Sequence, residues 1–314
     1  MKIKEDIPQY DNTHFAVVDL GSNSFHLLIT QVHENQVYTV NKVKRKVRLA
    51  AGLNKHLELS NEAINRGLDC LTLFSKHLDT IPLSNIRIVS TAALRIAKNR
   101  ADFFNKANKI LPLEIKLLSG KQEAETIYSG VAHTAKNNIK DKQLVIDIGG
   151  ASTELIIGQG FTANKAISLD LGCVSYREKF FTDGLLTNQN FAAAVAAASS
   201  IVKPSCLEFI KFGWQSAVGS SGTIRALAEI LSYQKQEITI TSAFLIEVQQ
   251  MLINCKTIEN IKIDGLREDR TPVLASGLCI LIALFDCLQI KELKLSTGAL
   301  REGLLFEMLA SQDK

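Results

Sequence analysis

The sequence predicts an α/β protein made of two related domains. The first observation is an internal repeat: residues 16–30 read AVVDLGSNSFHLLIT and residues 144–158 read LVIDIGGASTELIIG. The second is the alternation of β-rich runs with segments of helical periodicity along the rest of the chain. The third is the composition of the 314 residues, 46% hydrophobic and 22% charged, which is ordinary for a globular protein with a large core.

Each copy of the repeat is predicted to be a β-hairpin with a tight turn. A β-rich run leads to Asp-x-Gly and small residues, and a second β-rich run follows. A single duplication of this kind favours two related domains over a solenoid of short repeats. We therefore place the domain boundary near residue 130, which gives domains 1–130 and 131–314.

The rest of the chain is predicted to alternate between helices and strands. A capping box at Ser119 and Gln122 marks the start of one of the helices. In chain order we expect a helix over 61–78, a strand over 85–91, a helix over 119–132, a helix over 191–210, a strand, turn and helix over 217–231, a buried helix over 273–288, and a strand and helix over 293–309.

Charge and cysteine content narrow the class of protein. The net charge of +4 is small for a protein that binds duplex DNA through its charge, so no specific nucleic-acid partner is expected. The six cysteines show no zinc-like or C-x-x-C spacing, which favours reduced thiols in a cytoplasmic protein. The longest apolar stretch, residues 273–285, is shorter than the ~20 residues that cross a bilayer, and no membrane partner is expected.

The two Asp-x-Gly turns are candidate phosphate sites. Backbone N–H groups of a turn rich in glycine and serine can converge on an anionic oxygen, and the aspartate at the strand end can hold a divalent cation. Two turns in register are stronger evidence than one, since Asp-Gly alone is common in hairpins. A third small-residue loop, residues 219–223, precedes a helix whose N-terminus would favour anions, although such a loop alone is more often a plain turn.

Eight segments that include these loops carry a specific resemblance to a known family. They are FAVVDLGSNSFHLLI (15–29), STAALRIAKN (90–99), LSGKQEAETIYSGV (118–131), LVIDIGGASTELIIG (144–158), SLDLGCVSYREKF (168–180), AVGSSGTIRALAEI (217–230), GLREDRTPVLASGLCIL (265–281) and STGALREGLL (296–305). Together they resemble the exopolyphosphatase/guanosine pentaphosphate phosphohydrolase (Ppx/GppA) family of the actin/Hsp70/sugar-kinase superfamily. The resemblance implies two duplicated ribonuclease-H-like α/β domains with a cleft between them.

The same resemblance implies hydrolysis of a terminal phosphoanhydride with Mg²⁺ or another divalent cation. The leading hypothesis is an exopolyphosphatase that releases orthophosphate from inorganic polyphosphate. The alternatives are hydrolysis of guanosine pentaphosphate (pppGpp) and a non-catalytic sensor that binds such anions. Polyphosphate or guanosine polyphosphate is thus the expected partner, and the resemblance also allows a homodimer.

Roles for named residues also follow from the resemblance. Glu123 matches the family's proposed catalytic carboxylate and would orient or deprotonate the attacking water; without that context it would be an exposed acid in a helix's first turn. Asp147, Glu154 and Asp19 match positions expected near the cation. The phosphate-binding candidates are Ser22, Asn23, Ser24, Arg95, Gly149, Gly150, Ser152, Thr153, Ser221, Gly222, Thr223 and Arg270.

Two positions depart from the family pattern. Gln122 stands where the first acid of a Glu-Glu pair is usual, and an amide cannot hold a metal as a carboxylate does. Ala151 stands where a third glycine is usual. Alanine restricts positive φ angles, so a shift in substrate preference or rate is expected there.

A run of alternating basic residues lies between the first hairpin and the first helix. Lys42, Lys44, Lys46 and Arg48 would place four cations on one face of a strand. This pattern fits either a track for a polyanion or a solvated edge strand. His26, beside the first turn, is expected to be a packed histidine.

Overall fold

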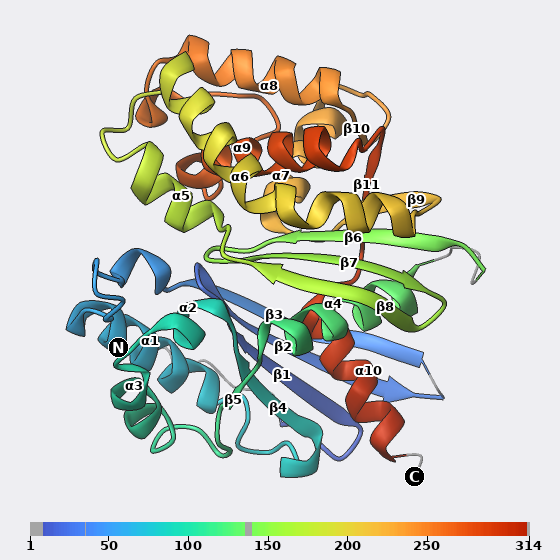
Figure 1. The fold of residues 1–314 in the computed structure, drawn as a ribbon. Helices are drawn as coiled ribbons and strands as arrows, with labels where there is room; N and C mark the ends of the chain where they lie inside the picture. The colour runs from blue at the N-terminus through green and yellow to red at the C-terminus, as the bar shows by residue number, and fades with distance from the viewer. Residues whose placement is uncertain (1–8, 35, 136–139, 313–314) are drawn as a thin grey trace. The chain divides into compact units, whose positions relative to one another are not determined.

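The structure is a computed structural model that describes residues 9–34, 36–135 and 140–312. Contacts divide the chain into two compact units. Unit 1 is Met1–Ser119 with Leu304–Lys314, and unit 2 is Gly120–Gly303. Each unit contains a mixed sheet with helices (Figure 1), which confirms the predicted α/β class.

The division between the units differs from the boundary expected near residue 130. Helix α4 (Gly120–Thr134) belongs wholly to unit 2, because it packs against β7 (Thr153–Gln159) and β8 (Thr162–Leu169). Helix α10 (Leu300–Gln312) begins in unit 2, and its later residues belong to unit 1, where the Gln312 side chain donates to Asn85. The repeat locates the second hairpin, but it carries no signal for the helix that packs against it.

The sheet of unit 1 has five strands in the order β3-β2-β1-β4-β5. Three of them form an antiparallel meander, and the last two join it in parallel. Every residue of β1 is buried or half-buried, which explains its nearly continuous apolar run. The strands are β1 (His14–Leu20), β2 (Ser24–His33), β3 (Gln36–Lys46), β4 (Ile86–Ser90) and β5 (Lys116–Leu117).

Three α-helices of unit 1 follow the meander: α1 (Asn61–Ser75), α2 (Ala92–Ile96) and α3 (Arg100–Ala107). Ser60 caps α1 by accepting a hydrogen bond from the backbone N–H of Ala63. Short 3₁₀ turns lie at Ala50–Gly52 and Leu83–Asn85. The helix predicted over 61–78 and the strand predicted over 85–91 are both present, each somewhat shorter than expected.

The sheet of unit 2 repeats this plan with one additional strand, in the order β10-β11-β9-β6-β7-β8. Strands β6, β7 and β8 form an antiparallel meander, and β9 joins β6 in parallel as β4 joins β1. The duplicated meander with its parallel extension is the predicted ribonuclease-H-like arrangement. The remaining strands are β6 (Lys142–Ile148), β9 (Ser216–Gly219), β10 (Thr239–Ile240) and β11 (Leu293–Leu295).

Helix α9 (Thr271–Leu288) forms the centre of the helical layer of unit 2. It contacts α5 (Cys173–Phe180), α6 (Asn188–Phe212), α7 (Gly222–Tyr233) and α8 (Ser242–Cys255), and Figure 1 shows these helices gathered on the β6 side of the sheet. A 3₁₀ turn, Ile258–Asn260, also contacts it. Helix α4 contacts the same sheet at β7 and β8.

Two of these helices, α6 and α9, have the length and apolar composition of a membrane-crossing segment. In α9, 72% of the most apolar window is buried within the protein, which is typical of a core helix. In α6 the corresponding fraction is 28%, and its buried side chains, such as Phe191, Ala194 and Val202, recur at helical spacing. Because α6 packs along α9, this apolar stripe has a partner inside unit 2.

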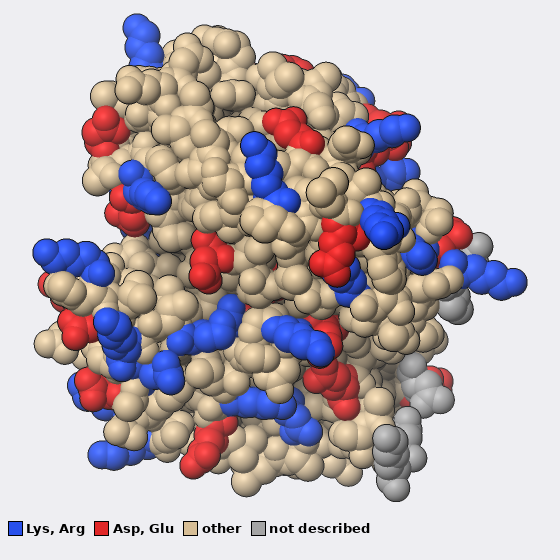
Figure 2. Space-filling view, in the orientation of Figure 1, with Lys and Arg blue, Asp and Glu red and all other residues tan. Residues whose placement is uncertain are grey.

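Charged side chains of both signs are spread over the surface. In Figure 2 basic residues lie over much of the visible face, with acidic residues between them. This mixture fits the small net charge of +4.

Candidate active site

The hairpin turn of unit 2 brings two carboxylates onto one face of the sheet. Asp147 of β6 and Glu154 of β7 are direct partners in the antiparallel register, so their side chains share a face. Between them, the Gly149 N–H donates to the Ser152 carbonyl at 2.8 Å. A Cβ on Gly149 would lie only 3.1 Å from that carbonyl, so glycine permits the close approach that shapes the turn.

The third small-residue loop is fixed beside this turn. The Ser220 hydroxyl donates to Asp147 Oδ2 at 2.6 Å, and the Ser220 N–H donates to the Ile146 carbonyl. Ser220 is a site residue that the sequence analysis missed. The small-residue run marked the loop, but only the pairing of β9 with β6 shows which hydroxyl reaches the aspartate.

Glu154 is a buried carboxyl group. Its residue is 1% exposed, and the Ser168 hydroxyl donates to Glu154 Oε1 at 2.8 Å. Burial, followed by the nearby negative charges of Glu123 and Asp147, raises the pKa of Glu154 well above its ordinary value. Hydrogen bonds from Ser152 and Ser168 oppose this rise in pKa.

Glu123 lies in the first turn of α4 and is 6% exposed. It is therefore not the exposed helix-end acid that its local sequence alone would suggest. Helix α4 begins at Gly120, which places Ser119 at the N-cap position and Gln122 in the first turn. We refer to Glu123, Asp147 and Glu154 as the acidic cluster, since the first two charges both act on the third.

The acidic cluster fits an open divalent-cation site and does not form a closed cage. Within the described ranges, no three His, Cys, Asp or Glu side chains are placed to hold a metal ion by themselves. Mg²⁺ is commonly held by one or two carboxylates together with water and substrate phosphates, which is the donor set that Asp147 and Glu154 offer. A cation there would also offset the repulsion that raises the pKa of Glu154.

The backbone of the second turn rests on the N-terminus of α5. The Gly149 carbonyl accepts from the Cys173 N–H, and the Gly150 carbonyl accepts from the N–H groups of Val174 and Ser175. A Cβ on Gly172 would clash with the Gly150 carbonyl and the Ala151 backbone, so the close approach depends on that glycine.

The side chains of this turn are less available to a ligand than its backbone. Ser152 is 2% exposed, Thr153 is fully buried, and the Thr153 hydroxyl donates to the Leu171 carbonyl at 2.6 Å. Ala151 is not among the residues with positive φ, so alanine is accommodated there without backbone strain, and the expected shift in substrate preference or rate stays a prediction. Any phosphate contact from this turn is expected from backbone N–H groups, chiefly those of Gly150 and its neighbours.

Arg270 places a mostly buried cation at the N-terminus of α7. Ser221 caps this helix by accepting from the Ile224 N–H, and Gly222 and Thr223 form its first turn. The Arg270 guanidinium lies against Gly222 and forms an ion pair with Asp269 at 3.7 Å. Burial lowers the pKa of Arg270, and Asp269 opposes that shift. A guanidinium beside the positive end of a helix is suited to phosphate.

The corresponding turn of unit 1 makes a similar close approach. A Cβ on Gly21 would lie 2.8 Å from the Ser24 carbonyl, as Gly149 approaches Ser152 in unit 2. The Ser22 hydroxyl accepts from the Ala93 N–H at 3.1 Å, so it caps α2. The Asn23 carbonyl accepts from backbone N–H groups of the segment after β3, and both serines are buried.

Asp19, the third predicted cation ligand, pairs with a histidine in unit 1. Asp19 Oδ2 lies 3.6 Å from His26 Nδ1, and both side chains are mostly buried. Lys44 of β3 is the register partner of His26, which is itself the register partner of Asp19. Lys42, Lys44 and Lys46 therefore lie on the same face of the sheet as Asp19. Arg48 lies beyond the end of β3 and has a positive φ, so the expectation of four cations on one strand face is wrong for that residue.

Arg95 is tied to the protein backbone. One guanidinium nitrogen, Nη1, donates to the Leu118 carbonyl at 3.1 Å. This bond joins α2 to the segment that precedes α4. A phosphate contact from Arg95 stays a prediction.

Comparison with known proteins identifies the family of this chain. Residues 28–312 match the Ppx/GppA phosphatase family. Proteins named guanosine-5'-triphosphate,3'-diphosphate pyrophosphatase from Aliivibrio fischeri and Photobacterium profundum are 49% and 47% identical over 295 and 296 residues. Each alignment covers 94% of this chain and 59% of the relative, so the chain spans about three fifths of the length of these relatives.

Solved structures show the same fold. An exopolyphosphatase from Cytophaga hutchinsonii ATCC 33406 has a TM-score of 0.85 at 24% identity, covering 95% of this chain and 98% of that one. The Aquifex aeolicus member of the Ppx/GppA family has a TM-score of 0.76 at 22% identity, covering 96% and 99%. With the sequence match extending over most of its length, the chain belongs to the Ppx/GppA phosphatase family.

Proposed function

We propose that this protein hydrolyses the terminal phosphoanhydride of pppGpp and releases orthophosphate. The observation that carries the proposal is the Asp147–Ser220 hydrogen bond, which holds the acidic cluster beside a loop that leads into a helix N-terminus. The names of these two relatives favour pppGpp over inorganic polyphosphate, the leading hypothesis from sequence. Polyphosphate is therefore the competing substrate in the experiment below.

The phosphate chain would be held by the anion-binding groups of unit 2. Backbone N–H groups of residues 150–152 and of the α7 N-terminus would bind phosphoryl oxygens, and Arg270 would donate from its guanidinium. These groups are positioned by the protein before the substrate arrives. Such preorganised donors stabilise the negative charge of the phosphoryl oxygens in the transition state.

Glu123 would orient the attacking water and accept its proton. The water oxygen forms a bond to the terminal phosphorus, the bond from that phosphorus to the bridging oxygen breaks, and the nucleotide leaves with the bridging oxygen. The Glu123 residue is 6% exposed, so its carboxylate has little competing bulk water. When bound by Asp147 and Glu154, Mg²⁺ would supply positive charge for the phosphoryl oxygens.

The substrate assignment is tested by steady-state hydrolysis of pppGpp, inorganic polyphosphate and ATP in the presence of Mg²⁺. We expect the highest kcat/KM for pppGpp. A higher value for polyphosphate would overturn the substrate assignment and restore the first hypothesis. Inertness toward all three, with binding retained, would support a non-catalytic sensor instead.

The role of Glu123 is tested by Glu123→Gln, with Glu125→Gln as the matched control. Both residues lie on α4, and Glu125 is a solvent-accessible acid within reach of Lys121. We expect kcat to fall by roughly 10²-fold or more for Glu123→Gln, with little change in KM, because general bases contribute on that scale. Equal turnover by the two variants would exclude Glu123 as the base.

A further inference from the structure

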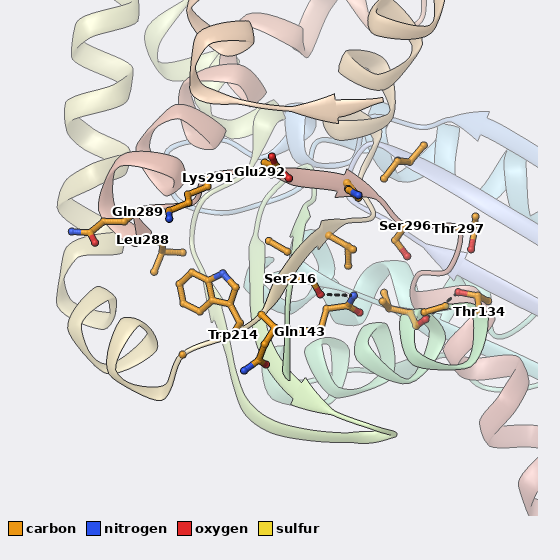
Figure 3. Close-up of a pocket in the computed structure, with 18 of the residues that line it drawn as sticks. Thr134, Gln143, Trp214, Ser216, Leu288, Gln289, Lys291, Glu292, Ser296 and Thr297 are labelled. Carbon is orange, nitrogen blue, oxygen red and sulfur yellow. Dashed lines mark hydrogen bonds between the residues drawn. The ribbon is translucent and has the colours of Figure 1, made fainter. Parts of the chain in front are cut away.

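A large hollow in unit 2 is lined by residues outside the acidic cluster. Its volume is about 1080 Å³, and Figure 3 shows the side chains that surround it. Gln143 and Ser216, which line it, lie at or near the starts of β6 and β9, whereas the turn at 149–152 and the loop at 219–223 follow the ends of those strands. Because β6 and β9 run in parallel, Gln143 and Ser216 lie at the opposite end of these strands from the candidate active site, while the lining of the hollow continues along β9 and β11 to Val218 and Ser296.

One wall of the hollow combines an aromatic ring with amide groups. Trp214, half-buried and the single tryptophan of the chain, lines it together with Leu288 and Gln289. Gln143 is 6% exposed and its Nε2 donates to the Ser216 hydroxyl at 3.3 Å, which fixes that part of the wall. An indole ring offers a surface for stacking a planar ring, and amides can both donate to and accept from its edge.

The rim of the hollow carries two cations. Lys291 and Lys294 line it and are exposed, and neither forms an ion pair with a residue in 9–34, 36–135 or 140–312. Glu292 lies between them in sequence and also lines the hollow, so the rim has a net positive charge. An anionic group attached to a planar ring would therefore find its counter-charge on the rim of the same hollow that the indole lines.

We infer that this hollow binds a purine mononucleotide at a site separate from the candidate active site. The base would stack on Trp214, its edge would meet the amides of the wall, and the phosphate would be bound by Lys291 and Lys294. No bond is made or broken there. The inference goes beyond the proposed hydrolase activity, because none of its residues belongs to the acidic cluster or to the phosphate-binding loops.

Trp214 gives a direct readout, because it is the one tryptophan of the chain and lines the hollow. The experiment is titration of the whole protein with GMP, guanosine and inorganic phosphate while tryptophan fluorescence is recorded. GMP has no phosphoanhydride and is not a substrate of the proposed reaction. We expect a saturable change in fluorescence with GMP. Guanosine and phosphate should bind at least ~10-fold more weakly, because guanosine lacks the phosphate group and phosphate lacks the base.

The double variant Lys291→Ala/Lys294→Ala tests the location, and Lys203→Ala on the exposed side of α6 is the matched control. We expect GMP affinity to fall about tenfold in the double variant and to stay unchanged in the control, with pppGpp turnover unaffected in both. No saturable change with GMP, or equal affinity in the two variants, would overturn the inference. If the double variant loses GMP binding but keeps pppGpp turnover, the GMP site is separate from the proposed hydrolase activity. GMP binding by a wild-type protein that hydrolyses none of the three substrates would also show that the two proposals are independent.

Discussion

The Arg270 guanidinium occupies the space that a Cβ on Gly222 would need. Arg270 comes directly before α9 and Gly222 begins α7, so this contact joins two segments that are far apart in the sequence. Glycine at the helix start thus allows a mostly buried cation to lie against the N-terminal turn. The pair brings two sources of positive charge, a side chain and a helix end, to one place.

Gly222→Ala is expected to lower the free energy of unfolding by less than the ~1–3 kcal/mol that overpacking a rigid core costs, because the new methyl group meets only the far end of the flexible Arg270 side chain, which can move away. Chemical denaturation of Gly222→Ala, Arg270→Ala and the double variant measures this. In the double variant the clash is gone, so the two losses should not add. Strict additivity would show that the alanine acts through something other than Arg270.

Ser220→Ala is expected to lower kcat/KM for pppGpp, because Asp147 Oδ2 loses its donor at 2.6 Å. Removing a hydrogen bond to a charged group costs about 1.5–3 kcal/mol, which corresponds to a roughly tenfold or larger fall in kcat/KM. Ser232→Ala, at an exposed position of helix α7, which follows the Ser220 loop, is the control for activity assays at several Mg²⁺ concentrations. Identical kinetics in both variants would contradict a role for the Asp147–Ser220 contact.

The raised pKa of Glu154 predicts a pH-dependent stability in metal-free buffer. The unfolded chain titrates near the ordinary value of 4.5, whereas the folded protein holds the proton to higher pH. The folded state therefore binds more protons above pH 4.5, and stability falls as pH rises from there toward the folded pKa. Urea unfolding in EDTA should show this decline in the wild type and a smaller decline in Glu154→Gln. The exposed variant Glu259→Gln should keep the wild-type slope, and an unchanged slope in Glu154→Gln would refute the assignment.

Gly303→Ala is expected to disturb both stability and turnover. A Cβ on Gly303 of α10 would clash with the Thr126 carbonyl of α4, one turn after Glu123. Moving α4 by a few tenths of an ångström would displace the Glu123 carboxylate, which we propose orients the attacking water. Gly184→Ala is the comparison, because its positive φ costs stability while nothing lies within 4 Å of its Cβ. Unfolding curves and kcat for both variants would show a loss of turnover in Gly303→Ala alone.

The sequence by itself determined the duplication, the class of fold and the family. Asp19 and Asp147 stand at equivalent places in two copies of one pattern, and the β-rich runs around them are long enough to be read as hairpins. Local patterns suffice for this because alternation of side chains along a strand and glycine in a tight turn are properties of neighbouring residues. The second hairpin is found correctly even though the unit boundary falls before α4.

Only the tertiary structure decided which side chains meet. The burial of Glu123 depends on where α4 packs, Ser220 reaches Asp147 because β9 pairs with β6, and Ser22 and Thr153 commit their hydroxyls to neighbouring backbone. These contacts join residues far apart in the chain, and no spacing rule specifies them. A carboxylate's chemistry is set by the dielectric and the charges around it, which exist only after the chain has folded.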